Sequence, residues 1–110
     1  MKRIVALLQK RGILFSTLTP IDPKLLKTRK KIEIYEGVDL GGYYVAIFAI
    51  TQKSRFLRKN AEEIEELYRR LIALREHNFK KKILIYEMPL CSKAMAQMRE
   101  AKWILIDAAA

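Results

Sequence analysis

The pattern of hydrophobic and polar positions changes period along the chain, and its central part repeats every two residues. Apolar and polar side chains alternate over residues 31–39, and residues 43–52 are rich in β-branched and aromatic side chains. Both patterns are typical of strands. Gly41 and Gly42 lie between them and favour the positive φ angles of a tight turn, so we expect an antiparallel hairpin whose second strand is largely buried.

Other segments carry apolar residues three or four positions apart, which is the repeat of a helix with one buried face. The strongest repeat covers residues 61–76, and Asn60 before it is expected to cap that helix. Residues 13–15 fit either a strand or a docked loop, residues 19–23 are expected to form a turn, and a short helix over 24–27 is an open alternative. The predicted elements are helices over 2–11, 61–76 and 93–101 and strands over 31–39, 43–52, 82–86 and 103–106.

The order of these elements indicates the fold class. A strand, a helix and a strand follow one another over residues 82–106, and this order predicts a parallel β-α-β unit. With the hairpin before them, the order α-β-β-α-β-α-β predicts an α/β fold with a mixed central β-sheet flanked by helices. At 110 residues, we expect residues 1–110 to form a single domain, whose modest core a homodimer would extend.

The number of cysteines and the length of the apolar runs indicate in which cellular compartment the protein is expected. Cys91 is the only cysteine, so no disulfide can form within the chain. The apolar run of residues 4–8 is too short for a signal peptide, and the run Val45–Ile50 is far shorter than the ~20 residues of a membrane span. We therefore expect a cytoplasmic protein with no membrane partner.

The net charge of +10 is unevenly distributed. Residues 1–31 carry an excess of eight positive charges, whereas residues 32–52 carry only three acidic side chains. Segregated basic clusters favour a polyanionic partner, and the first choice is nucleic acid, either DNA or RNA. The residues predicted to contact nucleic acid are Lys30, Lys31, Arg55, Arg58, Lys59, Lys80, Lys81 and Lys82.

One set of residues near the hairpin has the composition of a catalytic site. Thr51 and Lys53 share one face of the second strand near its end, and Asp39 lies at the end of the partner strand. A carboxylate and a lysine at strand ends can hold a divalent metal and stabilise charge on an attacked phosphate. We therefore predict Asp39, Thr51 and Lys53 as candidate catalytic residues, with Asp39 as the metal ligand.

This arrangement resembles the restriction-endonuclease-like superfamily, the PD-(D/E)xK nucleases, and in particular its small archaeal Holliday-junction resolvases and RecB-type nuclease domains. In that family an Asp on one strand precedes a (D/E)-x-K triplet on the next, and Val38-Asp39 and Thr51-Gln52-Lys53 are the matching segments here. The resemblance covers most of residues 30–107. It implies a nuclease fold, a nucleic-acid substrate and Mg²⁺ or Mn²⁺ as cofactor if the chain is catalytically active.

The match to the family motif is incomplete, because Thr51 stands where the family carries a second acidic ligand. Gln52 is an alternative neutral ligand. Glu36 is a conceivable substitute if Gly37 marks a bulge that turns its side chain to the face of Asp39. Whether the chain is an enzyme is therefore left open at this stage.

Other reactive or aromatic side chains receive structural interpretations. Cys91 opens the helix over 93–101, where backbone N–H groups would lower the pKa of the thiol, and we interpret it as structural. His77 follows the long helix and is interpreted as a cap rather than a catalytic base. Tyr43 and Tyr44 point to opposite faces of the hairpin, and packing is the default role of each, with base stacking as the alternative.

The sequence thus predicts a nucleic-acid-binding protein that resembles PD-(D/E)xK nucleases, with possible metal-dependent phosphodiester cleavage. Two alternatives stay open: a DNA- or RNA-binding module without enzymatic activity, and an interaction domain whose basic face contacts an acidic protein. Binding that weakens steeply with salt would favour the first two, because displaced counterions determine that slope.

Overall fold

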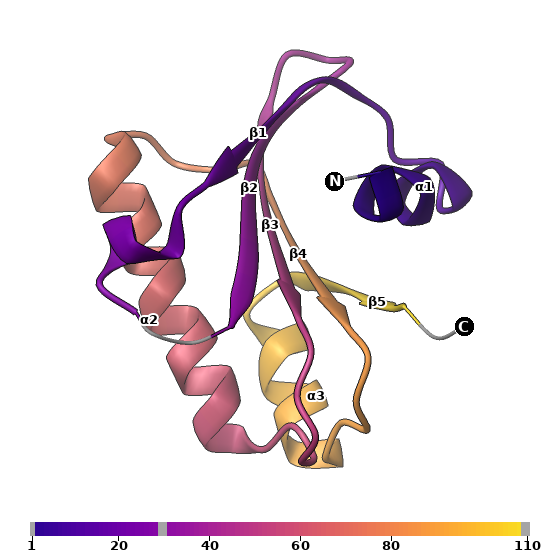
Figure 1. Cartoon of the computed structure of the whole chain (residues 1–110), viewed down its shortest axis with the longest axis vertical. Coiled ribbons are helices and arrows are strands. Elements are labelled where there is room, and N and C mark those ends of the chain that lie inside the picture. The colour runs from indigo at the N-terminus through magenta and orange to yellow at the C-terminus, as the bar shows by residue number, and fades with distance from the viewer. Residues whose placement is uncertain (1, 29–30, 109–110) are drawn as a thin grey trace.

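The computed structural model describes residues 2–28 and 31–108, and it contains a five-stranded sheet flanked by helices (Figure 1). The fold is an α/β fold with a mixed central sheet, as the sequence predicts. The elements in chain order are α1 (Lys2–Lys10), β1 (Phe15–Ile21), the 3-10 helix η1 (Pro23–Leu26), β2 (Ile32–Asp39), β3 (Tyr44–Ile50), α2 (Arg58–Arg75), β4 (Lys81–Tyr86), α3 (Ser92–Glu100) and β5 (Trp103–Asp107).

The strands lie in the sheet in the order in which they occur in the chain. β1, β2 and β3 form an antiparallel meander, and β4 and β5 continue the sheet parallel to β3. The crossover connections that parallel strands need are supplied by α2 and α3. β3 is the central strand and is buried over Val45–Ile50, which agrees with its continuous apolar sequence.

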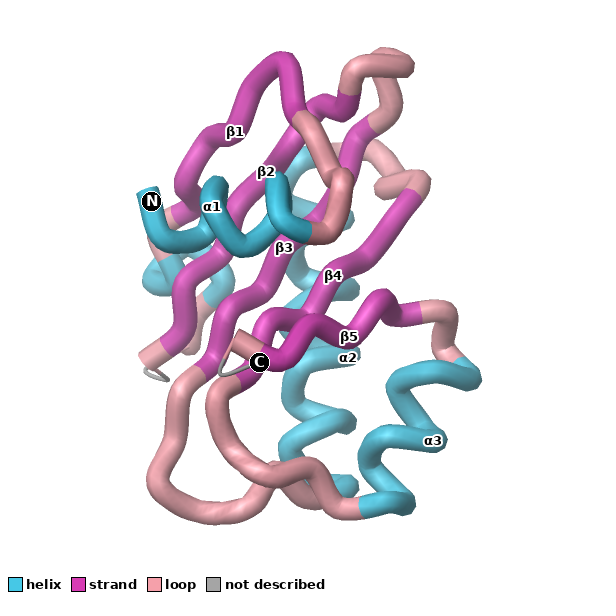
Figure 2. The backbone as a smooth tube through the Cα atoms, turned by 90° about the vertical axis from the view of Figure 1, so that its right-hand side faces the viewer, coloured by secondary structure: helices cyan, strands magenta, loops and turns pink. Residues whose placement is uncertain are grey.

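The helices divide between the two faces of the sheet. Figure 2 shows α1 lying across one face, with α2 and α3 on the other. Each face has its own apolar cluster, because successive side chains of a strand point to opposite faces. Phe48 packs toward α2, whereas Ile47 packs toward Ile4 and Leu8 of α1. No helix within the described residues is long and apolar enough to cross a membrane.

The segment before the hairpin differs from the sequence prediction. β1 extends to Ile21, where a turn over 19–23 was expected, and it pairs with β2 along its length. Pro20 is tolerated because β1 is an edge strand, where a missing N–H is least costly. The short helix considered over 24–27 is present as η1, and the side chain of Asp22 accepts a hydrogen bond from the backbone N–H of Lys24 at 3.0 Å.

The long helix starts earlier than predicted. α2 begins at Arg58, so Asn60 lies inside the first turn instead of capping it. Asn60 Oδ1 accepts a hydrogen bond from the backbone N–H of Leu57 at 2.8 Å, and its side chain is buried. The residue type that signals a helix start is therefore present, but it acts from the third helical position back onto the residue before the helix.

Close packing between β1 and β2 explains why position 37 is a glycine. A Cβ atom on Gly37 would lie 2.6 Å from Cε1 of Phe15, so any side chain there would collide with that ring. The pairing of β2 with β3 is regular from Ile32 to Val38, and Gly37 therefore does not mark a bulge in this pairing. The glycine makes room for packing and does not redirect Glu36.

Candidate functional site

The sheet has two ends with different chemistry. We call the end that carries the turn 40–43 and the start of β4 the hairpin end, and the end that carries residues 51–57 and 87–91 the loop end. In Figure 1 the hairpin end is at the top and the loop end at the bottom. β3 and β4 both finish at the loop end, and ligands of open α/β sheets bind outside the carboxyl ends of the parallel strands.

The structure does not bring the predicted catalytic residues together. Val38 pairs with Tyr44 and Ile32 with Ile50, so Asp39 lies at the hairpin end and Thr51 at the loop end. The length of β3 separates them, which amounts to about 20 Å at 3.3 Å per residue. A single site formed by Asp39, Thr51 and Lys53 is therefore wrong. The physical reason is that the last residue of one antiparallel strand lies beside the first residue of the next.

Asp39 has a structural role in the turn. Its Oδ1 accepts hydrogen bonds from the backbone N–H groups of Gly41 and Tyr43, both at 2.9 Å. Its own backbone N–H donates to the carbonyl of Tyr43 at 3.0 Å. Gly42 supplies the one positive φ angle among the turn glycines, at 85°. The Asp39 carboxylate thus closes the hairpin, which occupies one of its oxygens.

Thr51 and Lys53 lie at the loop end, which also carries the carboxylates of Glu33 and Glu87. Thr51 Oγ1 donates to Oε2 of Glu87, at 3.5 Å, and Glu87 also forms an ion pair with Arg3 of α1. On β2, Glu33 accepts a hydrogen bond from the hydroxyl of Tyr35 at 3.0 Å. Burial and this bond raise the pKa of Tyr35 to about 12. Both carboxylates therefore already have partners within the protein.

Among the residues that the structure describes, the predicted metal ligand Asp39 has no second carboxylate beside it at the hairpin end that could complete a metal site with Thr51 and Lys53. Within residues 2–28 and 31–108, no group of three or more His, Cys, Asp or Glu side chains could hold a metal ion. Mg²⁺ in proteins relies on one or two carboxylates with water and phosphate oxygens. At the loop end, Arg3 competes for Glu87, and Asp39 is a strand length away. The metal site that the sequence predicts around Asp39 is therefore not formed, and Glu87 is the carboxylate that lies beside Thr51.

The predicted nucleic-acid contacts fall into two groups, one at each end of the sheet. The loop-end basic cluster is exposed and consists of Lys31, Lys53, Arg55, Arg58 and Lys59. Lys80, Lys81 and Lys82 lie at the hairpin end, because the first residues of β4 pair with the start of β3. Lys30 lies outside the described residues.

The lysines of the hairpin end are not equivalent. Lys82 is half-buried, and its Nζ lies 4.9 Å from the ring centre of Tyr68 and 5.3 Å from that of Trp103. These rings attract the ammonium group and hold it on the α2 face. Lys80 and Lys81 are exposed. The lysine triplet therefore offers two side chains to an external anion.

Glu36 is a buried carboxylate that binds the exposed Arg75 and the half-buried His77, an ionic cluster that the sequence did not predict. Arg75 donates from Nε to Oε1 of Glu36 at 3.1 Å and from Nη2 to Oε2 at 2.8 Å. Nε2 of His77 lies 2.7 Å from Oε1, and its Nδ1 lies 3.0 Å from the carbonyl of Asn78. Both ring nitrogens of His77 face an oxygen atom, so the ring is oriented from both sides. Glu36 is therefore a structural anchor for the end of α2 and is not a substitute metal ligand.

A signal for this cluster exists in the sequence. Glu36 shares a strand face with Ile32 and Ile34, which are buried, and its own side chain is 6% exposed. An acidic side chain on the apolar face of a strand needs a partner, because an unpaired buried charge is costly. The partner cannot be identified from spacing, since Arg75 is 39 residues away.

Cys91 lies immediately before α3 at the loop end. Hydrogen bonds from the backbone N–H groups of Ala94 and Lys93 lower the pKa of its thiol, and the charge of Arg55 acts in the same direction against the opposing effect of burial. The backbone N–H of Cys91 also donates to the carbonyl of Phe56 at 3.0 Å. Cys91 thus joins the β3–α2 connection to the start of α3.

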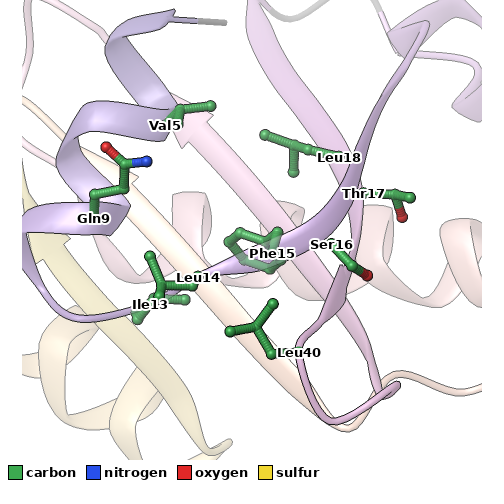
Figure 3. Close-up of a pocket in the computed structure, with 9 residues that line it drawn as sticks. All are labelled: Val5, Gln9, Ile13, Leu14, Phe15, Ser16, Thr17, Leu18 and Leu40. Carbon is green, nitrogen blue, oxygen red and sulfur yellow. The ribbon is translucent and has the colours of Figure 1, made fainter.

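An apolar cavity of about 320 Å³ lies between α1, β1 and the hairpin turn (Figure 3). Its lining residues include Val5, Phe15, Leu18 and the exposed Leu14 and Leu40. None of the residues that line it is ionisable. The cavity therefore brings no acid, base or charged group to a bound molecule.

Comparison with known proteins gives a likeness in structure. No family model matches the sequence, and no curated protein sequence matches it. The fold is similar to that in the crystal structure of a repair endonuclease from Pyrococcus abyssi, with a TM-score of 0.50 and 12% sequence identity over 78% of this chain. The match covers 41% of the other chain, so this chain spans less than half the length of that protein. The fold of this chain therefore resembles that of a repair endonuclease.

Proposed function

We propose that this protein binds nucleic acid through the phosphate backbone, using the loop-end basic cluster. The observation that carries the proposal is the position of the five exposed Lys and Arg side chains at the end of the sheet where the parallel strands finish. The likeness to a repair endonuclease supports the same class of partner. Lys and Arg contacts to phosphates position a protein on nucleic acid without reading its sequence.

Local structure holds the basic cluster in place. The side-chain amide of Gln52 donates to the carbonyls of Ser54 and Arg55, both at 3.2 Å, and so folds the segment around Lys53 back on itself. Phe56 is fully buried, and its backbone forms an isolated parallel β-bridge with that of Leu90. Arg58 and Lys59 follow in the first turn of α2. The exposed side chains are thus carried on a backbone that is fixed on both sides.

The salt dependence of binding tests this proposal. We expect the logarithm of the association constant for a duplex to fall linearly with the logarithm of the salt concentration. Each phosphate contact should contribute about 0.9 to the slope. Replacing Lys53 and Arg55 together by Gln should lower the slope by about two and weaken binding to all sequences equally. The measurement is fluorescence anisotropy across a range of salt concentrations.

A matched variant separates position from total charge. Lys10→Gln with Lys24→Gln removes the same number of charges from exposed positions in α1 and η1. We expect this pair to leave the slope nearly unchanged. Equal slopes for the two double variants would contradict the loop end as the binding surface, and the absence of binding at low salt would contradict nucleic acid as the partner.

Metal-dependent phosphodiester cleavage is the second candidate function. Its support is the likeness to a repair endonuclease, together with Thr51, Lys53 and Glu87 at the carboxyl ends of β3 and β4. Incubation with single-stranded, duplex and branched DNA and with RNA, in Mg²⁺ or Mn²⁺, tests it. Cleavage that Lys53→Ala abolishes and Asp39→Asn leaves intact would support a loop-end site. Tight binding without cleavage in either metal would leave a binding module.

A further inference from the structure

The hairpin end carries two exposed aromatic side chains. Tyr43 is 51% exposed and Tyr44 is 42% exposed, whereas Tyr35 on the neighbouring strand is 5% exposed. Tyr43 lies in the turn and Tyr44 is the first residue of β3, so the two rings flank the same strand start. An exposed ring offers a flat apolar surface that a planar ligand can cover.

The backbone under these rings is fixed by hydrogen bonds. The N–H of Tyr43 donates to Asp39 Oδ1 at 2.9 Å, and the carbonyl of Tyr44 accepts from the N–H of Lys80 at 2.8 Å. The ring of Tyr44 stacks on the ring of His77, with 3.9 Å between ring centres. His77 is in turn bound to the buried Glu36. The rings are therefore presented on a rigid support, which lowers the entropic cost of binding.

Positive charge surrounds the rings. Lys80 Nζ lies 4.3 Å from the ring centre of Tyr43, and Lys81 follows at the start of β4. Lys102 precedes β5, whose first residue pairs with Lys82, so it continues the same edge of the sheet. Within the described residues, none of these three lysines forms an ion pair with an acidic side chain. Lys80 covers one face of the Tyr43 ring and leaves the other face for a planar ligand. Aromatic rings beside lysines match bases and phosphates of a nucleic-acid strand.

We propose that the hairpin end is a second nucleic-acid surface, which takes unpaired bases by stacking on Tyr43 while Lys80 and Lys81 contact the adjacent phosphates. The proposal rests on the proposed function, because it assigns the same class of partner to the opposite end of the sheet. It adds a preference for single-stranded segments, since paired bases within a duplex do not offer their faces for stacking.

The test compares a labelled dT strand of about 16 nucleotides with a duplex of equal length, by anisotropy at low salt. Tyr43→Ala should weaken binding of the single strand at least about fivefold and change duplex binding by less than about twofold. Tyr43→Phe keeps the ring and should bind as the native protein does. Leu40→Ala is the matched control, because Leu40 is an exposed apolar residue of the same turn without an aromatic face.

Fluorescence of a Trp placed at the same position provides an independent measurement. In Tyr43→Trp, saturation with the dT strand should quench the fluorescence of the new Trp beyond the change seen in the native protein, whose Trp103 is 4% exposed. Thermal melting of each variant checks the fold.

The outcomes separate the two proposals. A Tyr43→Ala variant that binds both ligands as the native protein does, or loses both equally, overturns the stacking surface, and the loop-end proposal then stands or falls by its own salt slopes. Native protein that binds neither ligand overturns both proposals.

Discussion

The two ends of the sheet differ in how their polar groups are used. At the hairpin end, Asp39 closes the turn and Glu36 is held by Arg75 and His77, so the acidic groups are consumed by the fold. At the loop end, the basic side chains are exposed, and the neutral side chain of Gln52 holds the segment that carries Lys53 and Arg55. A charged residue such as Asp39, whose hydrogen bonds already stabilise the fold, is not available for binding or catalysis even where the surrounding sequence resembles a motif.

The largest expected effect is on the ionic cluster of the hairpin end. Glu36→Ala removes the carboxylate that binds both Arg75 and His77, and we expect the loss of these bonds to lower the free energy of unfolding by about 1.5–3 kcal/mol. Glu33→Ala on the same strand removes an exposed carboxylate and should cost less than about 1 kcal/mol. Urea unfolding measures both. Similar losses for the two variants would remove the distinction between the ends.

A second prediction concerns the bond between Tyr35 and Glu33. The pKa of Tyr35 is raised to about 12 in the folded protein, so the neutral phenol is favoured by folding. This stabilisation is fully present below the ordinary tyrosine pKa of about 10 and is lost as pH rises through about 12, a change of up to about 2–3 kcal/mol. Tyr35→Phe should flatten the decline in stability over that range, measured by urea unfolding at several alkaline pH values. Tyr43→Phe, at an exposed position, should decline as the native protein does.

A third prediction compares one variant at each end of the sheet, for its effect on stability and on binding. Asp39→Ala should lower the free energy of unfolding by about 1–2 kcal/mol, because two backbone N–H groups lose their acceptor, and should leave duplex binding unchanged. Lys53→Gln should leave stability unchanged and weaken duplex binding. Unfolding and anisotropy are measured on the same samples. Asp39→Asn keeps the acceptor oxygen and should restore most of the stability.

The smallest expected effect is on Cys91. Its thiol pKa is lowered by the backbone N–H groups of Ala94 and Lys93 and, to a smaller extent, by the charge of Arg55. Arg55→Gln should therefore move the midpoint of Cys91 alkylation to higher pH. The variant Lys10→Gln serves as the control. A midpoint that stays in place in Arg55→Gln would show that the loop holds Arg55 too far from the thiol to act on it.

Much of the fold could be predicted because local patterns determine it. Periods of two and of three to four residues locate β2, β3 and α2, and the strand–helix–strand order leads to the parallel half of the sheet. β1 is not predicted as a strand over its full length, because Pro20 and Pro23 indicate a turn over 19–23. Only the position of β1 at the sheet edge makes Pro20 acceptable within a strand.

The candidate site was harder to predict because it depends on which strand ends meet. Counting along the chain places Asp39 near the end of its strand, but antiparallel pairing places that end beside Tyr44, far from Thr51. Arg55, Arg58 and Lys59 are predictable as neighbours because they are close in sequence, whereas Lys31 joins them only through the pairing of Ile32 with Ile50. Contacts between distant residues, such as His77 with Glu36, leave no local pattern.

The proline of β1 has a consequence for association between copies of the protein. An edge strand presents unpaired backbone groups that can recruit a strand from another molecule, and such recruitment is a route to aggregation. Pro20 removes one N–H donor from this edge, and the pairing shift between Phe15 and Thr17 disturbs its regularity at the opposite end. β1 is thereby a poor template for a sixth strand, so the outer margin of the meander is protected against growth of the sheet from one chain to the next.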